Sequence, residues 1–276
     1  MLFNTFIHIP GIGATTERRL WQAGIHTWDD FKEPYPEFLP VQKIKLIMHH
    51  LEQSRRFLSS ALVDFVKMVP ISHRWRFFPH YRQSVAYLDI ESNGLGFTDN
   101  IITCATIYDG TVVRTYVHGE NMDDFITDLQ DYEMLVTYNG KAFDLPMIER
   151  SFGVRLRQLH LDLRPLLQSL GFVGGLKKCE QQLGICRDGL DGVDGSFAVV
   201  LWHEYVCTGN RAALETLLAY NIQDTVNLES LLVQAYNLKL GDTPFADSHQ
   251  LTLGDRPVTP YGPDRELVSR LLTALG

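Results

Sequence analysis

Residues 87–95 read YLDIESNGL, a β-like stretch that contains two acidic residues. On a strand, successive side chains alternate, so Asp89 and Glu91 share one face while Leu88 and Ile90 share the other. The two carboxylates are then about 6.6 Å apart along the strand. Like charges at this spacing repel unless water screens them or a cation lies between them. The stretch therefore fits either a solvated strand end or half of a divalent-metal site with oxygen ligands.

The sequence around this stretch predicts a mixed β-sheet covered by helices. Asp109-Gly110 supplies a hairpin turn, and the apolar run EMLVTY is typical of a central strand that is buried on both faces. Three antiparallel strands, followed by alternating helices and strands, indicate an α/β layered domain. The expected strands are residues 85–91, 101–107, 111–117, 133–138 and 159–163. The expected helices are residues 122–130, 145–152 and most of the chain from there to residue 240.

A second acidic group follows the fourth expected strand, in the stretch YNGKAFDLP. Asp144 precedes a helical pattern with proline in its first turn, which is typical of a helix N-cap. A loop at the carboxyl end of a central strand is also where open α/β sheets bind their ligands. Asn139, Gly140 and Lys141 in this turn are candidates for contacts with a substrate.

A third acidic group interrupts the apolar stripe of the helix expected over residues 211–238. The stripe predicts apolar residues near positions 221 and 224, where the chain has Asn221 and Asp224. An unpaired buried carboxylate is costly, and this helix has no lysine or arginine between Arg211 and Lys239. Asp224 therefore needs a metal ion, a distant arginine or a backbone group. Tyr220 lies one helical turn before Asp224, on the same side.

Together, Asp89, Glu91, Asp144 and Asp224 form a donor set suited to two divalent ions. A pair of such ions roughly 4 Å apart activates a water and stabilises the leaving oxygen of an in-line phosphoryl displacement. Tyr220 could orient that water or help to deprotonate it.

These residues resemble the three motifs of DEDD-type 3′–5′ exonucleases of the ribonuclease H-like superfamily. The motifs are Asp89-Ile90-Glu91, YNGKAFDLP with Asp144, and YNIQD from Tyr220 to Asp224, the last as in the Tyr-x-x-x-Asp subclass. The second motif resembles that of family B DNA polymerase proofreading domains, and the whole pattern most resembles the bacterial YprB-type ribonuclease H-like domain. The resemblance covers residues 84–240.

The resemblance implies a strand order of 3-2-1-4-5 and a site that binds two Mg or Mn ions. Asp89, Glu91 and Asp224 would bind the first ion, with Asp89 bridging to the second. Asp144 would support the second ion, and Tyr220 would align the nucleophilic water. The implied activity is metal-dependent 3′–5′ exonuclease cleavage of DNA or RNA, at a single-stranded or frayed 3′ end.

The N-terminal stretch IPGIGATTERRLWQAGI resembles a helix-hairpin-helix. In that motif, backbone N–H groups of the turn contact a phosphate, and Gly11 and Gly13 would permit the approach. The alternative is a turn that only packs helices. The stretch HRWRFFPHYR, residues 73–82, fits either a strand-tracking surface with stacking aromatic rings or part of a core.

We thus expect an α/β ribonuclease H-like fold with a small N-terminal helical region. The expected regions are a helix-hairpin-helix-like region at 1–70, a basic and aromatic bridge at 71–83, the exonuclease domain at 84–240 and a tail at 241–276. The tail includes one amphipathic helix, expected over residues 265–274.

Composition limits the other possibilities. The chain has 276 residues, 45% of them apolar, and a formal net charge of −8, which is ordinary for a globular protein with a sizeable core. It has no apolar run near the roughly 18 residues of a membrane span and no cationic leader, so we expect it in the cytoplasm. Its four cysteines lack zinc-site spacing and are expected to be buried free thiols.

Two functions other than an active exonuclease remain open. One is a nucleic-acid-binding scaffold whose ribonuclease H-like domain has weak or no activity, although no expected ligand is missing from the sequence. The other is a two-carboxylate glycosidase, which explains neither the buried Asp224 nor Tyr220.

Overall fold

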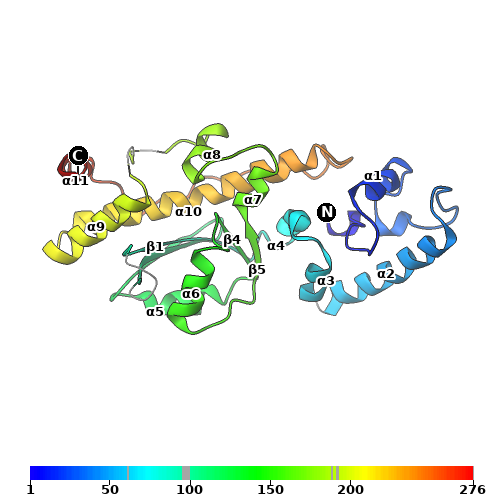
Figure 1. Cartoon of the computed structure of the whole chain (residues 1–276), viewed down its shortest axis with the longest axis horizontal. Coiled ribbons are helices and arrows are strands. Elements are labelled where there is room, and N and C mark those ends of the chain that lie inside the picture. The colour runs from blue at the N-terminus through cyan, green and yellow to red at the C-terminus, as the bar shows by residue number, and fades with distance from the viewer. Residues whose placement is uncertain (61, 95–99, 188, 191–192, 276) are drawn as a thin grey trace. The chain divides into compact units, whose positions relative to one another are not determined.

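The computed structural model describes residues 1–60, 62–94, 100–187, 189–190 and 193–275 (Figure 1). The chain forms two compact units. The helical unit comprises Met1–His80 and Tyr236–Leu251, and the sheet unit comprises Tyr81–Ala235 and Thr252–Gly276.

The sheet unit contains a mixed five-stranded sheet with the order β3-β2-β1-β4-β5. β1 pairs antiparallel with β2 and parallel with β4, so it is a central strand. The predicted fold class and strand order are confirmed. The strands are β1 (Val85–Ser92), β2 (Ile102–Tyr108), β3 (Val113–Val117), β4 (Met134–Thr137) and β5 (Leu159–Asp162).

The turn between β2 and β3 forms as its sequence predicts. The Asp109 carboxylate accepts hydrogen bonds from the backbone N–H groups of Thr111 and Val112, at 2.9 and 2.8 Å. Gly110 adopts a φ of 94°, a left-handed conformation that costs glycine little. This local chemistry fixes the register of the β2–β3 hairpin, in which Thr106 lies opposite Thr115. On its other side β2 pairs with β1, where Thr106 lies opposite Asp89.

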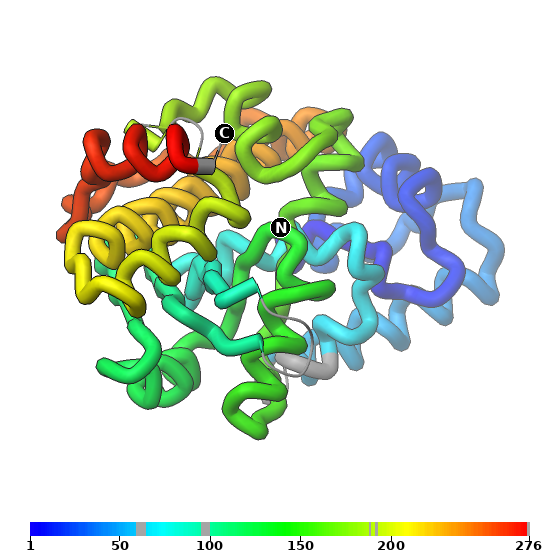
Figure 2. The backbone as a smooth tube through the Cα atoms, turned by 60° about the vertical axis from the view of Figure 1, so that its left-hand side comes forward, coloured from blue at the N-terminus to red at the C-terminus, as the bar shows by residue number. Residues whose placement is uncertain are grey.

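Helices cover both faces of the sheet (Figure 1). Packing follows the alternation of β1: Ala86, Leu88 and Ile90 join a core cluster with residues of α5 and α6, and the opposite face meets α9 and α10. Figure 2 shows α9, α10 and α11 side by side, and their apolar residues share one cluster. The helices are α5 (Met122–Leu129), α6 (Asp144–Phe152), α7 (Leu163–Gln168), α8 (Leu176–Gln182), α9 (Gly195–Thr208), α10 (Arg211–Leu240) and α11 (Arg265–Leu275).

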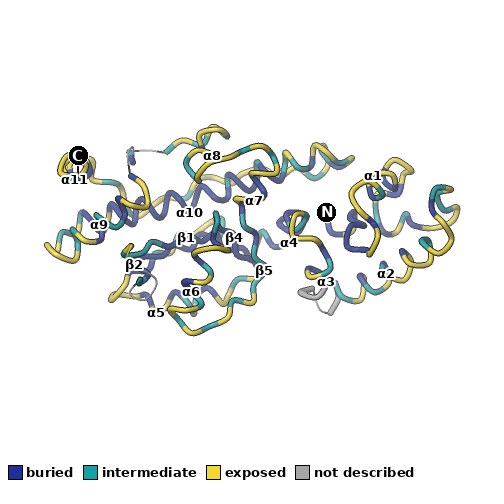
Figure 3. The backbone as a smooth tube through the Cα atoms, in the orientation of Figure 1, coloured by how far each residue is buried: buried dark blue, intermediate teal, exposed yellow. Residues whose placement is uncertain are grey.

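Helix α10 is buried on all sides over residues 216–229, as Figure 3 shows by its dark colour. An all-round apolar sequence would be usual for such a helix. This one instead buries several polar side chains, which therefore need partners within the protein. These side chains are Thr216, Asn221, Gln223, Asp224, Thr225, Asn227 and Glu229.

The helical unit surrounds an aromatic core that includes Trp28 and Phe65, with ring centroids 5.7 Å apart. The buried Glu17 carboxylate accepts hydrogen bonds from the Thr5 hydroxyl and from Arg76, at 2.8 and 2.9 Å. The segments are η1 (Leu2–Asn4), α1 (Ala14–Gln22), η2 (Trp28–Asp30), α2 (Val41–Ser60), α3 (Leu62–Met68), η3 (Ile71–Phe77) and α4 (Phe78–Tyr81), where η marks a 3₁₀ helix.

The basic and aromatic stretch at residues 73–82 belongs to the protein interior. Trp75, Phe77 and Phe78 are at most 3% exposed, so their rings cannot stack on bases. Arg76 is equally buried and pairs with Glu17. The core interpretation of this stretch is confirmed, and its interpretation as a strand-tracking surface is wrong for these residues.

The cysteine prediction is half right. Cys104 and Cys179 are buried free thiols, whereas Cys186 and Cys207 are exposed free thiols. Cys207 lies near the end of α9, and Cys186 lies in the segment after α8. Within the described residues, none of the helices is long and apolar enough to cross a membrane.

Candidate metal centre

Asp89 and Glu91 project from the β1 face that α10 covers, and Asp224 of α10 meets them there. One carboxylate oxygen of each residue lies within 4.8 Å of the others. β1 supplies two of these groups because its side chains alternate. The third comes from α10, at the position where the apolar stripe is interrupted. The structure thus brings together three of the acidic residues singled out in the sequence.

Asp144 contacts the same strand, β1, from the start of α6. Its Oδ1 accepts a hydrogen bond from the backbone N–H of Ile90, at 3.3 Å. Asp144 is the first residue of α6, and Phe143 holds the N-cap position without a side-chain bond, so the N-cap interpretation of Asp144 is wrong. Asp144 lies outside the three-oxygen group but is electrostatically coupled to it.

Burial and neighbouring negative charges raise the pKa values of Asp89, Glu91 and Asp144. Burial and then the Asp144 charge raise the pKa of Glu91 to about 8, and they raise the pKa of Asp89 well above its usual range. Burial raises the pKa of Asp144 to about 7. Each shift shows that a negative charge at this place is costly. A cation among these oxygens would reverse that cost.

Asp224 has a cationic partner that sequence reasoning left open as a distant arginine. Arg187, 37 residues earlier in the chain, pairs with Asp224 through Nη2 and with the fully buried Glu180 through Nη1. The burial of Asp224 therefore does not by itself require a metal ion. The case for a metal rests more on Asp89 and Glu91, which form no ion pair with any residue that the structure describes.

Asn221 holds the Asp89 carboxylate in place. Its Nδ2 donates to Asp89 Oδ2 at 2.7 Å, and its Oδ1 accepts from the Thr106 hydroxyl at 2.5 Å. Asn221 is completely buried, so these bonds fix its orientation. The sequence marks Asn221 as a break in the apolar stripe of the helix, and no role was predicted for it. A polar residue in that stripe is the sequence signal that could have identified a buried partner of the carboxylates.

Tyr220 lies beside the carboxylates and under two cations. Lys177 Nζ is 4.9 Å from the centre of its ring, and the Arg187 guanidinium carbon is 5.7 Å away. Burial, then Glu91 and Asp89, raise the pKa of the Tyr220 phenol. The phenol therefore stays protonated at neutral pH. This favours a role in orienting water over a role in deprotonating it.

The fold and these contacts agree with a comparison to known families. A family model described as RNase_H superfamily matches residues 86–236, more than half of the chain. The chain belongs to the RNase H superfamily. The matched region contains all of the carboxylates above.

Four chains among the solved structures are similar to this one, and one of them is a DNA polymerase. The structure of the family B DNA polymerase from the hyperthermophilic archaeon Pyrobaculum calidifontis matches 62% of this chain at 18% sequence identity, with a TM-score of 0.42. The match spans 28% of the polymerase chain. Curated proteins gave no match to this chain.

Nucleases of the RNase H superfamily use divalent metals, and the residues present here fit such ions. Carboxylate oxygens are the ligands that Mg²⁺ and Mn²⁺ prefer. Three of them converge within 4.8 Å, and two of these three lack a described cationic partner. Asp89, Glu91 and Asp224 are therefore suited to hold a divalent ion.

The turn after β4 in this superfamily domain is held by Asp162 at the end of β5. Asp162 accepts the backbone N–H groups of Asn139 and Lys141, at 2.8 and 3.3 Å. The Asn139 amide oxygen accepts from Arg164, while Lys141 is exposed. A Cβ at Gly140 would lie 2.2 Å from Thr137 Oγ1, so only glycine fits there. Substrate contacts by Asn139 and Lys141 stay a prediction.

Gly11 and Gly13 belong to the helical unit and not to the unit that carries the carboxylates. Gly11 has a φ of 76°, and its carbonyl accepts a hydrogen bond from Lys43 Nζ at 2.8 Å. Gly13 forms the N-cap of α1. Their proposed phosphate contacts stay a prediction.

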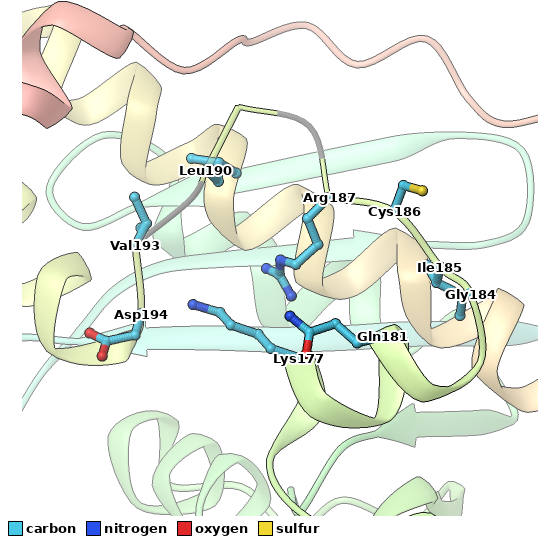
Figure 4. A pocket seen from close by; sticks show the side chains of 9 residues that line it. All are labelled: Lys177, Gln181, Gly184, Ile185, Cys186, Arg187, Leu190, Val193 and Asp194. Carbon is cyan, nitrogen blue, oxygen red and sulfur yellow. The ribbon is translucent and has the colours of Figure 1, made fainter.

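A pocket of about 600 Å³ lies beside the carboxylates, along α8 and the chain that leads to α9 (Figure 4). Lys177, Gln181 and Arg187 form its polar wall, and Leu190 and Val193 are among its apolar residues. The sequence alone assigns neither Lys177 nor Arg187 to this pocket. Neither residue belongs to a periodic pattern that would have indicated its place.

Proposed function

We propose that this protein is a metal-dependent nuclease that hydrolyses phosphodiester bonds from the 3′ end of single-stranded or frayed nucleic acid. The observation that carries the proposal is the convergence of Asp89, Glu91 and Asp224 within 4.8 Å in an RNase H superfamily domain. The order and spacing of the three motifs support the DEDD type, the Tyr-x-x-x-Asp subclass and closeness to the YprB-type domain.

The carboxylates have distinct proposed roles. Asp89, Glu91 and Asp224 would hold one Mg or Mn ion, with Asp89 shared by a second ion that Asp144 supports. When bound, such cations supply Lewis acidity for phosphodiester hydrolysis. Asn221 keeps Asp89 oriented through its 2.7 Å hydrogen bond, and the Ile90 N–H does the same for Asp144. The protonated Tyr220 would orient the attacking water.

The helical unit has a proposed role in holding the substrate. The turn containing Gly11 and Gly13 would contact a phosphate through backbone N–H groups, as in a helix-hairpin-helix. Such contacts read no sequence, so the unit would add affinity without base preference. The proposed division of the chain remains 1–70, 71–83, 84–240 and 241–276.

Cleavage of labelled single strands tests the nuclease proposal. With Mn²⁺ or Mg²⁺, the wild type should release labelled mononucleotide at once from a 3′-labelled strand and produce a ladder from a 5′-labelled strand. Asp89→Asn and Asp224→Asn should abolish both products. Glu215→Gln is the matched control, because Glu215 is an exposed acidic residue on the same helix as Asp224. Intact strands with the wild type under all conditions would refute the proposal.

One observation favours a second candidate, a nucleic-acid-binding scaffold with weak or no activity. Arg187 already neutralises Asp224, so the acidic group is partly satisfied without a metal. A wild type that binds single strands, leaves them intact and takes up no Mn²⁺ in calorimetry would support this scaffold function.

A further inference from the structure

The pocket beside the carboxylates has two cations on one wall. Figure 4 shows the ends of the Lys177 and Arg187 side chains turned toward the middle of this pocket. Both also approach the Tyr220 ring. Asp194 also lines the pocket, and its carboxylate caps α9 by accepting the backbone N–H groups of Ser196 and Phe197.

The charge of Arg187 is already used by the protein. Its guanidinium forms ion pairs with Glu180 and Asp224, and only 11% of its side chain is exposed. Glu180, in turn, accepts a hydrogen bond from Asn227 of α10 at 2.7 Å. Because the Arg187 guanidinium is already paired with two buried carboxylates, it is poorly suited to bind an anionic ligand.

Lys177 is in a different position. In the part of the chain that the structure describes, its ammonium forms no ion pair within 4.0 Å and contacts only the Tyr220 face. It is partly buried, which lowers its pKa, and the nearby Arg187 lowers it further. The negative charges of Asp194, Glu180 and Glu91 oppose this effect. Burying part of an ammonium group without a direct anionic partner costs free energy, and binding an anion from outside the protein offsets that cost.

We propose that Lys177 binds a phosphodiester of the nucleic-acid strand in this pocket, next to the carboxylate centre. The inference rests on the proposed function and adds a substrate-binding residue to it. A lysine suits this task, because its ammonium contacts phosphate as a point charge without requiring a fixed geometry. Its place over Tyr220 puts the bound phosphate beside the residue proposed to orient the water.

Salt-dependent binding tests the role of Lys177. The probe is a short fluorescein-labelled single strand with phosphorothioate linkages, titrated with the full chain in Mn²⁺ by fluorescence anisotropy at several salt concentrations. Lys177→Gln should weaken binding about tenfold, as expected for the loss of one charge-assisted contact. It should also reduce the slope of log K against log salt by about 0.7, because one phosphate contact is lost.

Lys178→Gln is the matched control. It makes the same charge change one residue away, at an exposed side chain that does not line the pocket. Lys178→Gln should leave the slope of log K against log salt nearly unchanged. Lys177→Arg, which keeps the positive charge, should show the wild-type slope. Equal slopes for Lys177→Gln and Lys178→Gln would overturn the proposal, provided that both variants melt at the wild-type temperature.

The two proposals fail in different ways. A wild type that shortens unmodified strands while Lys177→Gln keeps the full salt slope would refute the role of Lys177 alone. A wild type that never shortens strands but loses slope on Lys177→Gln would refute the nuclease and leave the phosphate contact established.

Discussion

At the scale of single residues, the site depends on a side chain that is not acidic. Asn221 of α10 connects Thr106 of β2 to Asp89 of β1 through two hydrogen bonds. The three side chains meet between β1, β2 and α10. Partners of metal ligands in other proteins orient the ligand and tune its affinity. Asn221 is placed to do the same for Asp89.

We therefore predict that Asn221→Ala lowers the affinity of the site for Mn²⁺ by about 10–100-fold, since the Asp89 carboxylate loses its donor. Isothermal titration calorimetry measures this directly. Asn210→Ala, an intermediate-exposure asparagine just before α10, is the control and should bind Mn²⁺ as the wild type does. Unchanged affinity in Asn221→Ala would show that Asp89 is held by other contacts.

At the scale of elements, the sequence predicts strands and helices whose apolar residues recur at a regular spacing. It does not predict contacts made by segments without such a spacing. β1 and α10 were found because alternation and the apolar stripe are properties of neighbouring residues, and the strand order followed from the motifs. The partner of Asp224 could not be found this way. Arg187 reaches it across 37 residues, from a short segment after α8 that has no repeating pattern. Asp162 was missed because its bonds go to backbone groups, which the sequence does not identify.

The link between α8 and α10 leads to a second prediction. Arg187→Met leaves Glu180 and Asp224 without their cation, and removing one partner of a buried ion pair costs about 3–5 kcal/mol. We expect this loss in the free energy of unfolding, measured with urea in EDTA. Arg164→Met, which removes an exposed bond to Asn139, should cost much less.

The same variant should respond more strongly to metal. With Arg187 gone, Asp224 offers both oxygens to a cation, so Mn²⁺ should raise the melting temperature of Arg187→Met more than that of the wild type. An equal rise in both proteins would indicate that the guanidinium and the ion do not compete for Asp224.

At the scale of the whole molecule, the two units should differ in their response to acid. His8 in the helical unit is 3% exposed and packs against Trp28 and Phe65. Among the residues that the structure describes, neither of its ring nitrogens has a hydrogen-bond partner. Burial, then the charge of His50, lower its pKa to about 3. The unfolded chain thus binds more protons than the folded one between pH 3 and 6.5, and stability falls as the pH falls through 6.5.

We predict that this effect costs the helical unit about 2 kcal/mol between pH 7.5 and pH 5. Tryptophan fluorescence during urea unfolding in EDTA will report it, because Trp21, Trp28 and Trp75 lie in this unit. His8→Phe should remove the loss, whereas the exposed His49→Gln should retain it. An equal loss in His8→Phe would assign the acid sensitivity to other groups.

The burial of α10 on every side has a consequence for how this protein can change over time. From Thr216 to Glu229 every position is buried, and Asn221 and Asn227 form hydrogen bonds to carboxylates of other elements. Nearly every substitution in this part of α10 disturbs a contact. Asn221, for example, can change only together with Thr106 of β2, to which it is hydrogen-bonded. The amino-acid sequence of residues 216–229 should therefore change more slowly in evolution than that of the rest of the chain. It would be the best anchor for recognising distant relatives whose loops and termini have diverged.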